Sequence, residues 1–233
     1  MHLSLIIVTS AGYELTVQRL DGLATAVADV KIHTFVLEEG TYSLGNDGAK
    51  MEVGKVDLVD SSSAWNGFTF GSEVTPQQSY ANPVVIGQMQ TSFSDHWVQF
   101  WSRGASANEP FKAGDTELTI GHHTGEDPDT WVPFVESAGY LIIEAGRGTL
   151  KGIPYEAGLS PKLGAVSADD SFEITASGTM QAVAKTLLSI EGMQNEDGGL
   201  PVLRNTTVSK ITVKIDEDKL ADDEREHGRE AVG

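Results

Sequence analysis

The 233-residue chain contains no cysteine, and this absence removes several kinds of chemistry together. Without thiols there is no disulfide, no cysteine nucleophile and no zinc site with cysteine ligands. A chain of this length buries enough apolar surface to fold without such cross-links. The absence does not fix the cellular compartment, because many secreted proteins of bacterial type also lack cysteine.

Basic residues are scarce. Lys and Arg number 16 against 34 Asp and Glu, which gives a formal net charge of -18 at pH 7. Such a charge repels the phosphates of nucleic acids and anionic membrane surfaces, so we expect no nucleic-acid partner. An acidic surface suits neutral glycans, cations or a salty medium, although solubility alone also explains it.

Long apolar runs and long amphipathic helices are also missing. The chain opens on MHLSLIIVTSAG, whose six-residue apolar run is too short to span a membrane and lacks the basic flank of a signal peptide. We therefore expect no membrane insertion and no signal peptide in this chain, and we predict a strand at LSLIIV. The stretch TMQAVAKTLLSIEG fits a helix and a strand about equally well.

The sequence does contain a series of short β-rich segments, separated by clusters of Gly, Pro, Asn, Asp and Ser. This pattern is typical of antiparallel strands joined by turns. The predicted strands are LSLIIV, YELTVQRL, KIHTFVL, NPVVIGQMQ, WVQFW, ELTIG, YLIIEAG, FEITASG and SKITVKID. The sequence therefore predicts an all-β protein, an antiparallel β-sandwich.

A weak internal repeat divides the chain. Residues 33 to 40, HTFVLEEG, share the outline of residues 139 to 146, GYLIIEAG, and a third copy begins at HGREAVG. A spacing of about a hundred residues is that of a small sandwich. We predict two related units: a partial or first unit in 1–60, a sandwich unit in 61–150, and a second or partial unit with an acidic C-terminal segment in 151–233. Either the chain is a fragment of a longer repetitive protein, or its first and last pieces pair.

Two strands carry a resemblance to a known family. The first strand reads PVV-x-G-Q-x-Q-T and the second reads GY-x-x-x-E. Their residues are Pro83, Val84, Val85, Gly87, Gln88, Gln90, Thr91, Gly139, Tyr140 and Glu144. Over residues 65–146 this pattern resembles the H-type lectin-like β-sandwich modules of extracellular lectins and of repetitive surface proteins.

The resemblance implies a six-stranded antiparallel sandwich, an extracellular or cell-surface location and a tendency to trimerise. It also implies binding of sugars of the N-acetylgalactosamine type at subunit junctions. The segment FKAGDTELTIGHHTGEDPDTWVPF, which lies between the two strands, is longer and more acidic than in the simplest lectins. No sugar-binding residue is therefore carried across to this chain.

Aromatic residues near this insertion are the candidates for binding a glycan. In WVQFW the period of a strand places Trp97, Gln99 and Trp101 on one face. Indole rings offer faces for stacking on sugar rings, and Asp127 and Trp131 could extend the same surface. Packing in a core or an interface is the other common use of tryptophan.

The loop HHTGEDPDTW is the candidate metal site. The imidazole and carboxylate groups of His122, Glu126, Asp127 and Asp129 could bind zinc or another divalent metal, and the three acids alone could bind calcium. Only one of the two adjacent histidines can join a given site, because neighbours in a strand point to opposite faces. A solvated acidic loop is the alternative, and no cofactor is required.

Glycan cleavage is the enzymatic alternative. It needs two carboxylates across a groove, one acting as acid and the other as base or nucleophile. Glu126 and Glu136 are the candidate pair. A chain with 34 acidic residues contains many such pairs by chance, so the presence of one is weak evidence for an enzyme. The sequence contains no G-x-S-x-G elbow of a serine hydrolase.

Three functional hypotheses remain. The leading one is an extracellular carbohydrate-binding or adhesive protein that binds a glycan or polysaccharide and could form a homo-oligomer. The first alternative is a glycoside hydrolase on the same scaffold, so whether the chain is an enzyme stays open. The second is a purely structural repeat of a surface protein.

Overall fold

Strands make up almost all of the regular structure. The computed structural model describes residues 2–9, 12–18, 32–58, 71–93, 98–106, 108–125, 134–163, 171–178, 180, 182–192, 199–217 and 228–233. Within these ranges the only helix is α1 (Leu44–Asp47), a single turn that begins after the capping residue Ser43 and ends at Gly48. The predicted all-β fold is confirmed.

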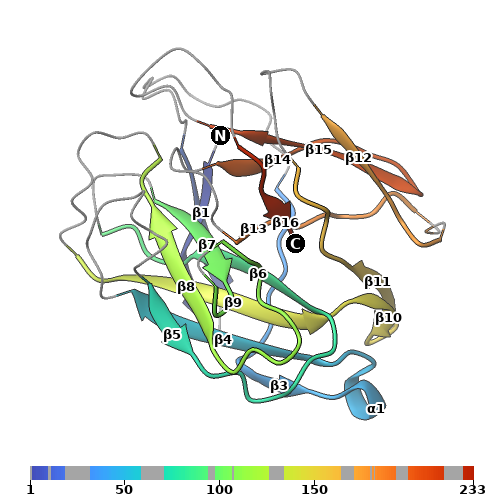
Figure 1. Ribbon diagram of the computed structural model, residues 1–233, viewed down its shortest axis with the longest axis horizontal. Coiled ribbons are helices and arrows are strands. Elements are labelled where there is room, and N and C mark those ends of the chain that lie inside the picture. The colour runs from blue at the N-terminus through green and yellow to red at the C-terminus, as the bar shows by residue number, and fades with distance from the viewer. Residues whose placement is uncertain are drawn as a thin grey trace.

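Two sheets pack face to face, and in Figure 1 the strands β7 and β8 cross the direction of β4 and β9. The first sheet is antiparallel and has the order β3 (Gly40–Tyr42), β4 (Met51–Leu58), β9 (Glu136–Glu144) and β6 (Pro83–Met89). The second has the order β16 (Ala231–Val232), β13 (Ile190–Glu191), β7 (Gln99–Arg103), β8 (Leu118–His123) and β5 (Ser72–Val74). In the second sheet β13 runs parallel to β7, and the other pairs are antiparallel.

An apolar core fills the space between the two sheets, because alternate residues of each strand face inward. The ring of Phe100 on β7 lies over Gly87 on β6, where a Cβ atom would overlap it. The close approach of the sheets therefore depends on a glycine at this position. The buried residues that line this core include Leu58, Val85, Met89, Ala138 and Ile142 from the first sheet, and Phe100, Leu118 and Ile120 from the second.

A third layer covers part of the second sheet. It consists of β12 (Phe172–Thr175), β15 (Lys210–Asp216) and β14 (Leu200–Thr206), with β15 in the centre. Ile190 and Val232, which pair across β13 and β16, form one apolar cluster with Ile215 of this layer. The C-terminal third of the chain is thereby attached to the sandwich.

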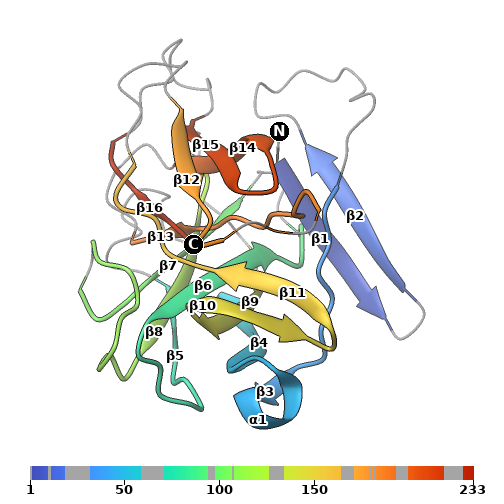
Figure 2. The same ribbon diagram turned by 90° about the vertical axis from the view of Figure 1, so that its right-hand side faces the viewer.

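Two hairpins extend from the layers, and Figure 2 shows the first of them projecting at the side of the molecule. It is formed by β1 (His2–Thr9) and β2 (Gly12–Gln18), and the second by β10 (Gly146–Leu150) and β11 (Ile153–Ala157). The turn of the second contains Lys151 and Gly152, both with positive φ, of 48° and 83°. This is the backbone of a two-residue type I′ turn.

The strand predictions were largely but not wholly right. The strand predicted at KIHTFVL was wrong, because residues 32–38 lie outside every strand of the described chain. Of the described residues in TMQAVAKTLLSIEG, only Ile190 and Glu191 belong to a strand. β4, the hairpin β10–β11 and β14 were not predicted. The sheets also join the three expected segments of the chain, since β4 pairs with β9 and β7 pairs with β13.

Candidate functional site

The Glu136 end of the sandwich, defined here as Asp57, Thr91, Phe93 and residues 134–137, is the candidate site. β4 finishes at Leu58 opposite Glu136, the first residue of β9, and β6 finishes at Met89 opposite Ala138. The connections from β6 to β7 and from β8 to β9 leave the sheets at this same end. Loops at the end of a sandwich are common places for ligand sites.

Glu136 is the buried anchor of this end. Its side chain is fully buried, and its carboxylate accepts hydrogen bonds from the Thr91 hydroxyl and from the Phe93 amide, the latter at 2.8 Å. The Thr91 hydroxyl oxygen in turn accepts from the Ser137 amide at 2.7 Å. These bonds attach residues 91–93 to the start of β9 and so fix the position of the Phe93 backbone.

Asp57 is a surface carboxylate held by the same framework. Asp57 and Ser137 are opposite each other across β4 and β9, and the Ser137 hydroxyl donates to the Asp57 carboxylate at 2.6 Å. The carbonyl of Asp57 also accepts from the Ser72 hydroxyl of β5, at 2.8 Å. One carboxylate oxygen is thus oriented by the protein, while the residue stays exposed to solvent.

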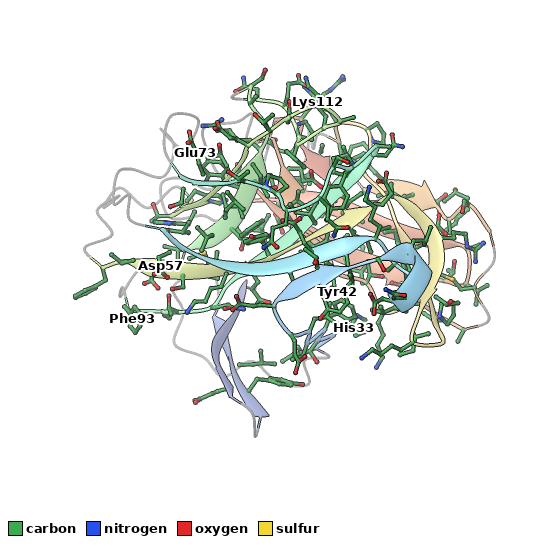
Figure 3. The ribbon with its side chains drawn as sticks, turned by 90° about the horizontal axis from the view of Figure 1, so that it is seen from below. His33, Tyr42, Asp57, Glu73, Phe93 and Lys112 are labelled. Atoms are coloured by element: carbon green, nitrogen blue, oxygen red, sulfur yellow. The ribbon has the colours of Figure 1, made fainter. Side chains whose placement is uncertain are left out.

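Exposed aromatic rings accompany this carboxylate. Phe93 is 62% exposed and Phe134 is 55% exposed, and both lie beside Glu136, one through its amide and the other two residues before it in the chain. Figure 3 shows Asp57 and Phe93 at the same end of the molecule. Exposed rings can stack on sugar rings and an oriented carboxylate can accept hydrogen bonds from hydroxyls, so this end of the sandwich carries both kinds of group that bind sugars.

Trp101 does not fit its predicted role in ligand binding. It is 1% exposed, and its ring lies over Gly121 and Gly71, where Cβ atoms would approach it too closely. A ring buried in this way has no free face for a sugar. Gln99 lies at the start of β7 opposite His123 and is half-buried, whereas the predicted partners Trp97, Asp127 and Trp131 lie outside the described residues.

The predicted metal site is only partly described. His122 and His123 end β8, and their opposite neighbours on β7 are Phe100 and Gln99, so they alternate between the faces as expected. Both are buried, and Nδ1 of His123 accepts from the Gly125 amide at 3.1 Å. Glu126, Asp127 and Asp129 lie outside the described residues. Within the described ranges, no three His, Asp or Glu side chains are grouped to hold a metal ion.

The predicted catalytic pair is likewise half described, since Glu126 lies outside the described residues. Glu136 has no exposed surface, and both of its carboxylate oxygens accept hydrogen bonds within the fold. A general acid or base has to reach the atom whose proton it transfers. The geometry gives Glu136 the role of a structural anchor.

Other carboxylates anchor the same stretch of chain. Four of them, on three strands, accept backbone N–H groups from residues 77–93, which include β6. Glu52 accepts from Gln77 and Gln78, Glu144 from Ala81 and Asn82, Glu191 from Val85, and Glu136 from Phe93. These four carboxylates therefore fix the backbone of residues 77–93 in place.

Burial perturbs two of these four groups. It raises the pKa of Glu191 to about 8, although the Val85 amide favours the charged form. It also raises the pKa of Glu52, against hydrogen bonds from the amides of Gln77 and Gln78 and from the Tyr80 hydroxyl. No described cation pairs with Glu191, so its carboxyl group holds a proton at neutral pH.

The family-like motif turns out to encode strand pairing. Its two halves are β6 and β9, which pair directly, with Gly87 opposite Tyr140 and Gln88 opposite Gly139. The side chain of Gln90 occupies the space in which Gly139 would carry a Cβ atom. Glu144 accepts two amides and Thr91 bridges Ser137 to Glu136, so these motif residues support the fold.

Phe93, Phe134 and Asp57 were missed by the sequence analysis. Phe93 lies in the polar stretch TSFSD and Phe134 lies after a proline in WVPFVES. An aromatic residue within a turn-rich segment is the signal that could have identified them, because such a ring has no strand partner to cover it.

No family model matches this chain, and neither the curated proteins nor the solved structures contain a significant match to it. In the described ranges, no helix is long and apolar enough to cross a membrane.

Proposed function

We propose that this protein is a non-catalytic carbohydrate-binding or adhesive sandwich of extracellular type, and that its glycan binds at the Glu136 end. The observation that carries the proposal is the pair of exposed rings, Phe93 and Phe134, at the same end of the sandwich as the oriented carboxylate of Asp57. Rings supply apolar contact to the faces of sugars, and the carboxylate accepts hydrogen bonds from hydroxyls. The resemblance to H-type lectin-like modules supports the same class of ligand.

The rigidity of the support favours binding. Phe93 is attached to β9 through Glu136, and Asp57 is attached to β9 through Ser137, so both sides of the surface rest on one strand. A surface ordered before the ligand arrives loses less entropy on binding. The net charge of -18 favours neutral rather than acidic glycans.

Binding is preferred to cleavage because of Glu136. A hydrolase that used Glu126 and Glu136 would need the second carboxylate at the surface of a groove, and Glu136 is fully buried. The decisive assay incubates the full chain with a panel of polysaccharides and follows both retention and new reducing ends. Retention without new ends supports the proposal, new ends would favour the hydrolase, and neither would favour a structural repeat.

We also propose, independently of the glycan site, that the loop that follows His122 binds a divalent cation. The melting temperature before and after dialysis against a chelator, with calcium or zinc then restored, tests it. An increase on adding one ion, larger than that given by the same ionic strength of sodium chloride, supports a site. Equal increases would remove the cation from the proposal.

A further inference from the structure

An uncharged apolar strip lies on a different part of the surface from the Glu136 end. Residues 32–37, Ile-His-Thr-Phe-Val-Leu, carry no acid, and Phe35 and Val36 are 48% and 50% exposed. Val183 and Leu187 add exposed apolar surface from the segment 182–188, which is joined to the strip by a hydrogen bond from the Thr186 amide to Nδ1 of His33. Figure 3 shows His33 well away from Phe93.

The backbone of this strip is open for pairing. In Figures 1 and 2 the segment runs without a turn from the level of the third layer down to β3. Among the described residues, no backbone-to-backbone hydrogen bond joins residues 32–37 to another segment. A run of N–H and C=O groups that lacks backbone partners within the described part of the chain is a template for a strand from another molecule.

The charges at the two ends of the strip are complementary. Lys185, beside Thr186, lies near the His33 end, and Glu38 and Glu39 follow the strip at its other end. The five steps along the chain from His33 to Glu38 span about 16 Å in extended form. All three side chains are exposed, and none forms an ion pair with another described residue.

We propose that residues 32–38 pair antiparallel with the same segment of a second copy of this chain, about a two-fold axis near Phe35 and Val36. The antiparallel arrangement brings Lys185 of each copy to Glu38 and Glu39 of the other. Two copies of a chain of charge -18 repel each other through their acidic side chains. Residues 32–37 carry no acid, so contact between two copies through this strip brings fewer negative charges together than contact through an acidic surface. This inference does not depend on the proposed glycan site.

Sedimentation velocity of the full chain over a range of concentrations tests the proposal. We expect the mass of two chains, and Val36→Glu should raise the dissociation constant of the dimer by more than about tenfold, because it buries a charge at the axis. Ile153→Glu, at an exposed apolar residue of the β10–β11 turn, is the matched control and should leave the dimer unchanged. A wild-type chain that stays monomeric, or a dimer that survives Val36→Glu, would overturn the proposal.

A charge exchange tests the predicted orientation. Lys185→Glu alone should weaken the dimer, and its combination with Glu38→Lys and Glu39→Lys should restore it, whereas a contact that is only apolar would show no restoration. The absence of cysteine permits a second test. Val36→Cys should cross-link two chains on oxidation and Ile153→Cys should not. Failure of both the restoration and the cross-link would exclude this two-fold arrangement.

Discussion

Individual glycines and carboxylates account for much of how this chain packs. Gly40 and Gly146, the last residues of the two similar sequences HTFVLEEG and GYLIIEAG, both have positive φ, of 145° and 129°. The repeated sequence therefore shares a glycine conformation at its end, although only the second copy lies in a strand before it, the strand β9 that ends at Glu144. Gly87 serves a different purpose, since the ring of Phe100 occupies the space of its missing side chain.

We predict that Gly87→Ala destabilises the protein by about 1–3 kcal/mol, because the added methyl group forces Phe100 out of its position in the core. Denaturant unfolding measures the change. Gly158→Ala is the control, because a Cβ atom there meets nothing within 4 Å. Equal stability of the two variants would show that the sheets can separate to admit the methyl group.

Glu191 gives a prediction for the pH dependence of stability. Burial raises its pKa in the folded protein to about 8, above the ordinary value of 4.5, so the folded state keeps a proton that the unfolded chain releases. The resulting stability is fully present below about pH 4.5 and is lost as pH rises through about 8, a change on the order of 5 kcal/mol.

Glu191→Gln tests this prediction, because glutamine keeps an oxygen for the Val85 amide and cannot ionise. The variant should match the wild type near pH 5 and exceed it in free energy of unfolding at pH 9. Urea titrations at both values measure the difference. A difference that does not change with pH would contradict the assigned protonation of Glu191.

Residue types and spacing could predict some of these features. The sequence predicted that His122 and His123 would alternate, and the register of β7 and β8 confirms it. It could not predict that Trp101 and Glu136 would be buried, because burial depends on which strand lies opposite. Tryptophan and glutamate serve both surfaces and interiors, and only long-range packing decides between them.

At the scale of elements, β6 shows how an edge strand is protected. β6 is the last strand of its sheet, and its outer N–H groups would otherwise lack partners. The Val85 amide donates to Glu191 at 2.8 Å, and the Ser189 hydroxyl both accepts from the Gly87 amide and donates to its carbonyl. Side chains two residues apart on one segment thus cover backbone groups two residues apart on β6.

We predict that Ser189→Ala exposes the edge of β6. It leaves the N–H and C=O groups of Gly87 without these partners, which should cost about 1–3 kcal/mol and speed hydrogen exchange of the Gly87 amide. Ser106→Ala, at an exposed serine of a loop, is the control. Unchanged exchange at Gly87 in the Ser189 variant would mean that other groups protect this edge.

The prediction of elements failed where the local pattern was ambiguous. β4 was missed because Glu52, Lys55 and Asp57 interrupt its apolar residues, which also change face along the strand: Met51 packs in one apolar cluster and Leu58 in another. The segment 32–38 has strong β propensity but pairs with no strand among the described residues, so propensity alone predicted a strand that the fold does not form.

At the scale of the whole molecule, acidic charge is the dominant property. The formal net charge is -18, and self-repulsion of this size destabilises a compact state. We predict that the melting temperature rises as sodium chloride is increased from about 0.02 M to about 0.5 M, because salt shortens the range of repulsion between charges. Tetramethylammonium chloride at the same ionic strength should raise the melting temperature by a similar amount, because screening does not depend on the kind of cation. A melting temperature independent of both salts would contradict this account.

We propose that the exposed rings of the Glu136 end bind a glycan. The most direct test titrates a glycan retained by the wild-type chain against Phe93→Ala, Phe134→Ala and the control Ile153→Ala. Loss of one stacking ring should weaken binding by about 1 kcal/mol, or roughly fivefold, for each phenylalanine, with no change for the control. Affinities that are equal in all three variants and the wild type would contradict the account.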